Sequence, residues 1–246
     1  MPSDLAPMGE KVSGASAIPI SKGAPTGILK LDMLLRGGLR QNGITLLIGP
    51  PGEEKKLAAL QFANSALVSK QPVVYVTTDV SPSELESTAG HYGLSLSGNP
   101  LLKFVDCYSW TLGSAPAGRN DIQVQGPSAL NDLAIALAQA LPESNQVAKP
   151  RVVLHSLSTL LLYNQPEVIF KFIQITGSRL KSSGATSLFL LESGMHDEKT
   201  VSTLRHLADE IIEIDFKGGK GKIRAPLSGV TEWLDFTVTG KGLELL

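Results

Sequence analysis

The segment from Gly49 to Lys56 carries residue types that could bind a phosphate group. It has the sequence GPPGEEKK and follows an apolar run, ITLLIG, that is typical of a buried strand. Phosphate-binding loops have the pattern G-x-x-x-x-G-K-[ST] between a strand and a helix. Backbone N–H groups wrap the phosphates, the lysine reaches the outer phosphates and the hydroxyl binds magnesium. Gly49 and Lys55 keep this spacing, and the residues between them are Pro50, Pro51, Gly52, Glu53 and Glu54.

Two positions of this segment depart from the pattern. Glu54 stands where the second glycine is expected, and Lys56 stands where the hydroxyl is expected. A carboxylate about 4 Å from a phosphate charge is repelled by about 4 kcal/mol at an effective dielectric of about 20. If position 54 requires a left-handed backbone, its Cβ costs a further ~1–2 kcal/mol. Magnesium also loses its protein ligand, so we expect ATP with magnesium to bind weakly or not at all, and no other cofactor.

A second group of chemistry-bearing side chains follows the ends of predicted strands. Imidazole and carboxylate groups that meet in one crevice could bind a transition metal. They could equally solvate the strand ends, and the sequence favours this reading because no tight ligand spacing is present. The group consists of Asp79, Asp106, His155, Glu192 and His196.

One local basic cluster lies near the C-terminus, interleaved with glycines. The cluster could contact a nucleic-acid backbone, but basic residues in this pattern more often lie on a solvated hairpin. The cluster consists of Lys217, Lys220, Lys222 and Arg224.

A separate candidate is Trp110, which could anchor a protein partner or cover the core.

The composition limits the class of protein. The chain has 246 residues, of which 42% are hydrophobic and 18% charged, and its 22 Lys and Arg nearly balance its 23 Asp and Glu. These values favour a substantial core and exclude wholesale disorder and a strongly basic nucleic-acid binder. The single cysteine, Cys107, excludes an intramolecular disulfide, and we expect it to be buried. With only strand-sized apolar runs and no signal-like N-terminus, the sequence predicts a cytoplasmic protein without membrane contact.

Hydrophobic periodicity predicts strands that alternate with helices. Strands are expected at 44–49, 73–78, 102–105, 151–156, 187–193 and 210–215. Helices are expected around Leu31–Leu35, at 57–69, 82–93, 128–141 (capped by Ser128), 166–183 and 200–209, with a loop at 109–127 and a linker at 142–150. This alternation predicts an α/β fold with a mainly parallel sheet flanked by helices, whose ligand site lies at the carboxyl ends of the strands. Residues 1–24 are predicted to be a flexible arm, and residues 25–246 a single domain ending in antiparallel hairpins.

Several longer segments occur in a specific order. They are TGILKLDMLLRGGLRQNGITLLIGPPG, VVYVTTDVSPSEL, VDCYS, VVLHSLSTLL, LLESGMHDEKTVSTLRHLADEIIEI and FTVTGKGLEL. In this order they resemble the archaeal KaiC-like branch of the RecA-superfamily ATPases, over about nine-tenths of the chain. The resemblance implies a RecA-like P-loop NTPase fold and assembly into rings or dimers through the nucleotide-facing edge.

The departures from the family pattern fall on its chemistry. The resemblance implies that the acidic pair of the family maps onto Asp79 and Val80, and that the Walker B aspartate maps onto His155. Together with Glu54 and Lys56, these changes affect the phosphate loop, the metal ligand and the base. The preferred hypothesis is therefore a pseudo-ATPase with degenerate Walker A and Walker B motifs, in which Asp79 and His155 are vestigial.

Such a protein would be regulatory or would act in assembly, in archaeal signal transduction or in control of a DNA-recombination ATPase. Its partner would be a second copy or an active RecA/KaiC-like relative. Two alternatives remain open. One is a divergent active ATPase, in which Lys55 and Lys56 replace magnesium and Asp79 is the base. The other is a nucleic-acid-binding accessory subunit resembling the Elongator accessory subunits, which would use the basic cluster.

Overall fold

The computed structural model describes residues 23–113, 121–142 and 148–246. The predicted arm at residues 1–24 therefore lies outside the described residues, except for its last two. Of these, Ala24 is buried and forms an antiparallel bridge with Leu39. Ala24 thus belongs to the packed part of the chain.

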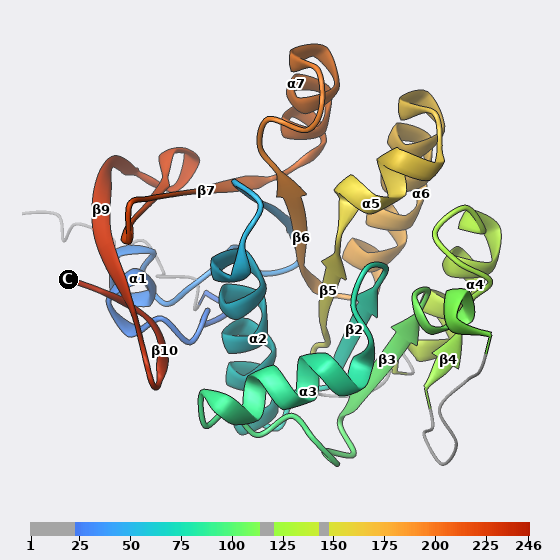
Figure 1. Cartoon of the computed structure of the whole chain (residues 1–246), viewed down its shortest axis with the longest axis horizontal. Coiled ribbons are helices and arrows are strands. Elements are labelled where there is room, and N and C mark those ends of the chain that lie inside the picture. Colours follow the sequence, from blue (N-terminus) through green and yellow to red (C-terminus); the bar gives the residue numbers. More distant parts are fainter. Residues whose placement is uncertain (1–22, 114–120, 143–147) are drawn as a thin grey trace, which may run out of the picture.

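The strands of the described chain form one ten-stranded sheet in the order β10-β9-β8-β7-β1-β6-β5-β2-β3-β4. The strands from β7 to β4 in this order are parallel, and β8, β9 and β10 extend the sheet in antiparallel fashion (Figure 1). Their bounds are β1 Ile44–Gly49, β2 Val73–Thr77, β3 Leu102–Asp106, β4 Ile122–Gln123, β5 Arg151–His155, β6 Thr186–Glu192, β7 Glu210–Lys217, β8 Lys220–Ala225, β9 Val230–Thr239 and β10 Gly242–Leu245.

The helices cover both faces of this sheet. They are α1 Leu29–Leu34, α2 Glu53–Val68, α3 Pro82–His91, α4 Leu130–Ala140, α5 Leu157–Tyr163, α6 Pro166–Ser182 and α7 Glu198–Leu207, with 3₁₀ turns at Ser109–Leu112 and Pro226–Ser228. The prediction of a mainly parallel α/β fold with C-terminal antiparallel hairpins is confirmed. The architecture is compatible with a RecA-like fold.

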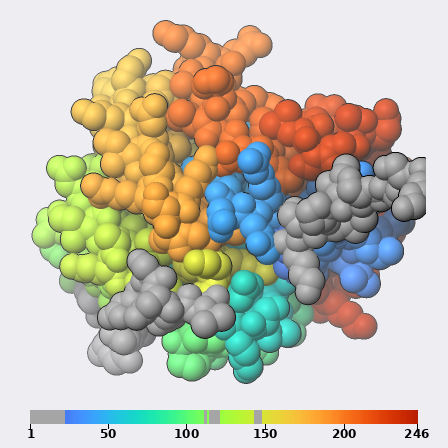
Figure 2. All heavy atoms as spheres, turned by 180° about the vertical axis from the view of Figure 1, so that it is seen from behind, coloured from blue at the N-terminus to red at the C-terminus, as the bar shows by residue number. Residues whose placement is uncertain are grey.

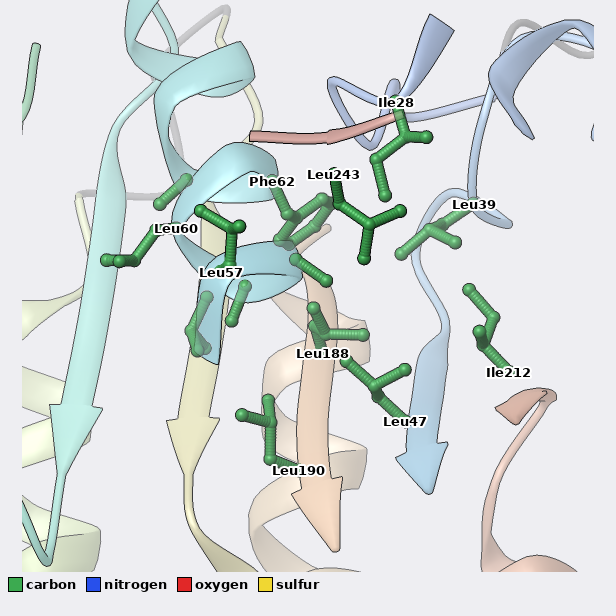
Figure 3. Close-up of a cluster of buried hydrophobic side chains, with 14 of the residues drawn as sticks. Ile28, Leu39, Leu47, Leu57, Leu60, Phe62, Leu188, Leu190, Ile212 and Leu243 are labelled. Atoms are coloured by element: carbon green, nitrogen blue, oxygen red, sulfur yellow. The ribbon is translucent and has the colours of Figure 1, made fainter. Parts of the chain in front are cut away.

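Strand alternation divides the core into two layers. In β1, Leu47 packs in the layer beneath α1, α2 and α3, whereas Leu46 and Ile48 pack in the layer beneath α4 to α7. Successive residues of a strand point to opposite faces, so an all-apolar strand supplies both layers. Figure 3 shows Leu57 and Phe62 of α2 meeting side chains from the strands beneath.

Helix α2 begins at Glu53, four residues before the predicted start. Glu53 and Glu54 occupy its first turn, where their negative charge interacts favourably with the helix dipole. Farther along, Gln61 anchors the helix to the C-terminal strand. Its Nε2 donates to the Leu243 carbonyl at 3.3 Å, and its Oε1 accepts from the Leu243 N–H at 2.8 Å.

Three further expectations need correction or fall outside the described chain. Ser128 does not cap α4, since Ala129 is the N-cap and makes no side-chain cap bond. The predicted loop at 109–127 contains the short strand β4. Residues 114–120 of this loop and residues 143–147 of the predicted linker lie outside the described chain.

Helix α5 was not predicted, because its sequence continues the apolar run of β5. The Ser156 hydroxyl caps it by accepting from the Thr159 N–H at 3.3 Å.

Candidate functional site

The candidate site lies at the carboxyl ends of the parallel strands. Gly49, the last residue of β1, pairs in register with Glu192, the last residue of β6. His155 ends β5 and pairs with Thr77 at the end of β2. The segment after β1 therefore meets the residues after β2, β5 and β6, as the predicted topology requires.

The non-helical part of the phosphate-loop segment has only three residues, Pro50 to Gly52, because α2 begins at Glu53. Two of these are prolines, which have no N–H to donate to a phosphate. Glu54 has helical backbone, so the left-handed penalty considered for this position does not arise. Its carboxylate folds back over the loop: a Cβ added to Gly52 would lie 2.5 Å from Glu54 Oε2.

Lys55 is held inside the protein. Its side chain is 2% exposed, its ammonium lies 3.5 Å from Glu192 Oε1, and it donates a hydrogen bond to the carbonyl oxygen of Pro50. Burial lowers the pKa of Lys55, and the neighbouring Glu192 carboxylate acts in the opposite direction. The charge that would meet a phosphate is thus neutralised by the chain itself.

Lys56 joins two helices instead of replacing the hydroxyl. Its ammonium lies 2.8 Å from Glu53 Oε2 and 3.9 Å from Glu84 Oε1 of α3. Both carboxylates are largely exposed, so each pair contributes at most about 1 kcal/mol to stability. The positive charges of Lys55 and Lys56 are therefore compensated within the chain, by Glu53, Glu84 and Glu192.

His155, onto which the resemblance maps the Walker B aspartate, is buried. Its Nδ1 lies 3.3 Å from the Tyr75 hydroxyl, and its Nε2 lies 3.8 Å from Asp79 Oδ1. Burial lowers the pKa of His155 to about 4, so the imidazole is neutral at pH 7. Burial also raises the pKa of Asp79. The contact between the two is therefore not an ion pair at neutral pH.

Lys56 and His155 do not supply the oxygen ligands that magnesium prefers. Lys56 places an ammonium where the loop pattern has a hydroxyl, and His155 is a neutral imidazole. Among the described residues, no group of three or more His, Cys, Asp or Glu side chains is arranged to hold a metal ion.

The strand-end group considered for a metal is divided in the structure. Asp106 accepts hydrogen bonds from the Tyr108 and Ser109 N–H groups, both at 2.9 Å, and so closes the turn after β3. His196 Nε2 lies 2.9 Å from Ser158 Oγ, which in turn accepts from the Glu192 N–H at 2.8 Å.

The single cysteine lies beside Asp106. Cys107 is buried as expected, and burial raises the pKa of its thiol to about 12.

The basic cluster is paired with acidic neighbours. Lys217 lies 3.3 Å from Asp215 Oδ2, and Lys222 lies 4.0 Å from Asp235 Oδ1. Arg224 donates to Glu213 Oε2 at 2.5 Å and stacks on Trp233, with 4.4 Å between Cζ and the ring centroid. The hairpin register thus places carboxylates beside these cations.

Trp110 is 55% exposed and so does not cover the core. No helix among the described residues has the length and apolarity needed to cross a membrane.

Sequence reasoning missed the partners of the site residues and one buried cation. Tyr75, Glu84 and Ser158 contact His155, Lys56 and His196 from other elements, and no local pattern indicates these pairs. The buried cation is Arg151, which is 2% exposed. Its burial could have been expected from the sequence, because Arg151 is a lone charged residue at the start of the apolar strand RVVLHS.

Comparison with known proteins finds relatives of this chain in archaea and in a bacterium. A UPF0273 protein of Methanopyrus kandleri is 26% identical over 202 residues, covering 80% of this chain and 78% of the relative. A UPF0273 protein of Methanocaldococcus jannaschii is 24% identical, with coverage of 84% and 85%. One from Thermotoga maritima is 27% identical, with the same coverage. The model of a "Family of unknown function (DUF7504)" matches residues 43–214, which is more than half of the chain. The chain therefore belongs to the DUF7504 family.

Proposed function

We propose that this chain is a pseudo-ATPase, a RecA/KaiC-like domain that works through protein contacts rather than through hydrolysis. The observation that carries the proposal is the engagement of Lys55 by Glu192 and the Pro50 carbonyl. A phosphate that enters this site must break that pair and also meet the carboxylate of Glu54. The changes at Lys56 and His155 remove two magnesium-binding positions at the same edge of the sheet.

The partner in this proposal is a second copy or an active RecA/KaiC-like relative. Exposed apolar side chains on α1 support a role in contact, since Leu29 is 77% exposed and Met33 is 72% exposed. The archaeal distribution of most of the relatives described above supports a setting in archaeal signal transduction or in regulation of a DNA-recombination ATPase.

Calorimetric titration of the full chain with ATP and magnesium tests the proposal, together with native mass spectrometry with and without ATP. We expect no heat of binding at micromolar protein, and an oligomer or a mixed complex whose mass does not change with ATP. Micromolar affinity, with ATP retained in the mass spectrum, would overturn the proposal.

A divergent ATPase is the second candidate, and one observation favours it. Asp79 lies at the site edge with a pKa raised by burial, and the positive charges of Lys56 and Lys55 act on it. A carboxylate of this kind suits a general base. Phosphate release above that of the Lys55→Ala and Asp79→Asn variants would support this candidate, and equal rates in all three proteins would exclude it.

The nucleic-acid alternative depends on the basic cluster. Because three of its four cations have acidic partners, little net positive charge faces outward there. This alternative is supported if the chain binds single-stranded RNA at low salt and the Lys220→Glu variant does not. It is excluded if the chain does not bind RNA even at low salt.

A further inference from the structure

A hollow of about 540 Å³ opens at the amino ends of the parallel strands, on the edge opposite to Gly49–Lys56. Figure 2 shows the blue, teal and yellow segments near residues 40, 70 and 150 meeting on this side of the molecule. Arg151 and Thr186 are the first residues of β5 and β6. The lining includes Arg36, Asn42, Gln71, Lys149, Arg151 and Thr186.

The charge of this hollow is positive. Arg36, Lys149 and Arg151 line it, and no Asp or Glu is present among its described lining residues. The C-terminus of α2, just before Ser69, contributes a partial negative charge of about 0.5. That partial charge offsets only a small part of three cations, so the hollow attracts an anion.

Arg151 is the buried member of the three cations. Its Nη1 donates to the carbonyl oxygens of Pro25 and Phe62, and its Cζ lies 4.8 Å over the Phe62 ring. Its Nε has no hydrogen-bond partner within the described part of the chain. Burial lowers the pKa of Arg151 only to about 10, so the side chain is cationic at pH 7.

Arg151 also lacks a carboxylate bonded to it among the described residues. Asp32, the acidic residue that acts on it electrostatically, accepts instead from the Thr26 N–H at 2.6 Å and the Gly27 N–H at 3.1 Å. A buried charge without a counter-charge costs several kcal/mol, even where carbonyl oxygens accept from it. An anion bound in the hollow would compensate this cost, which makes Arg151 the strongest indication of a ligand.

We propose that this hollow binds the phosphate group of a small molecule. The planar guanidinium of Arg151 suits an oxyanion, and the exposed residues Arg36 and Lys149 line the same hollow. Asn42 and Gln71 add neutral donors. Apolar lining from Ala24, Pro25, Ala148 and Pro150 gives room for an organic remainder, and the volume lies within the usual ~300–1,000 Å³ of small-molecule pockets.

Calorimetric titration of the full chain at fixed ionic strength tests the proposal, with inorganic phosphate and ribose 5-phosphate as probes. We expect Lys149→Gln and Arg36→Gln each to weaken binding about tenfold, the loss typical of one charge-assisted hydrogen bond. Arg151→Lys keeps the positive charge but loses the planar guanidinium with its paired N–H donors. The melting temperature of this variant shows whether the fold is intact. Lys171→Gln, an exposed lysine on α6, is the matched control and should leave binding unchanged.

A Lys55→Met variant separates this site from the phosphate-loop segment, which lies at the other end of the strands. We expect Lys55→Met to bind both probes as the wild type does. The proposal is wrong if neither probe binds the wild type. It is also wrong if binding is lost in Lys55→Met but kept in Lys149→Gln and Arg36→Gln, or if Lys171→Gln weakens binding as much as they do. Because the pseudo-ATPase proposal concerns ATP at the opposite edge, each proposal can fail without the other.

Discussion

The ammonium of Lys55 lies 3.5 Å from Glu192 Oε1, and the backbones that carry them are adjacent because Gly49 and Glu192 pair in register. The phosphate-loop lysine is therefore tied to the neighbouring strand. This relationship decides how the site responds to substitution.

Glu192→Gln should lower the free energy of unfolding by about 2–3 kcal/mol, because it removes the carboxylate charge beside the buried Lys55 ammonium and leaves it with neutral acceptors. Urea unfolding at pH 7 measures the change. Glu232→Gln, on the exposed face of β9, is the control and should stay within about 0.5 kcal/mol of the wild type. Equal stabilities of the two variants would show that the ion pair contributes nothing.

Glu54→Gly combined with Lys56→Thr should increase the affinity for ATP with magnesium at least ~tenfold, because it removes one repulsive charge and restores a hydroxyl. Calorimetry on the double variant and on Glu54→Gln alone separates the two effects. If the double variant binds no better than the wild type, the short loop or His155 is what prevents binding.

Acid should destabilise the protein through His155. Its pKa is about 4 when folded and about 6.5 when unfolded, so the unfolded state binds more protons between these values. Stability is therefore lost as the pH falls from 6.5 to 4, by roughly 3 kcal/mol from this residue. Asp79 acts in the opposite direction, since its raised pKa favours the folded state as the pH falls.

A His155→Gln variant isolates the histidine, because Asp79, Glu192 and both lysines are common to the two proteins. Urea unfolding at pH 7, 5.5 and 4.5 should show a shallower loss of stability in His155→Gln than in the wild type. Parallel pH profiles would mean that His155 titrates normally in the folded protein.

Gly221→Ala should destabilise the pairing of β8 with β9 by about 1–3 kcal/mol, because an added Cβ would overlap the ring of Phe236. Gly240→Ala, in the turn between β9 and β10, serves as the control, because its added Cβ would have no described atom within 4 Å. Thermal unfolding should separate the two variants by several degrees. Equal melting temperatures would show that the ring of Phe236 moves aside without cost.

The strands of the parallel sheet were predictable because each is a short apolar run between turn residues. The start of α2 was not, since Pro50, Pro51 and Gly52 suggested a longer loop. Glu53 and Glu54 were nevertheless a usable signal, because acidic residues favour the first turn of a helix. Helix α5 was hidden because Ser156, its cap, lies inside a continuous apolar segment.

The candidate site was predictable in its parts but not in its connections. The spacing of Gly49 and Lys55 and the position of His155 after an apolar strand are local patterns. The pairing of Lys55 with Glu192 depends on the order of strands in the sheet. The neutral state of His155 depends on burial by Tyr75 and its neighbours, and the isolation of Arg151 depends on where every carboxylate lies. None of these is written in a short stretch of sequence.

The attachment of Gln61 to Leu243 has a practical consequence for protein engineering. Cutting the chain after Gly240 would remove β10 and both hydrogen bonds between Gln61 and Leu243, at a cost of about 1–3 kcal/mol. The loss of these bonds would also weaken the attachment of α2, which is far from the cut in sequence. A purification handle fused directly behind Leu246 would also crowd its carbonyl, which accepts from Lys30, so a spacer is advisable there.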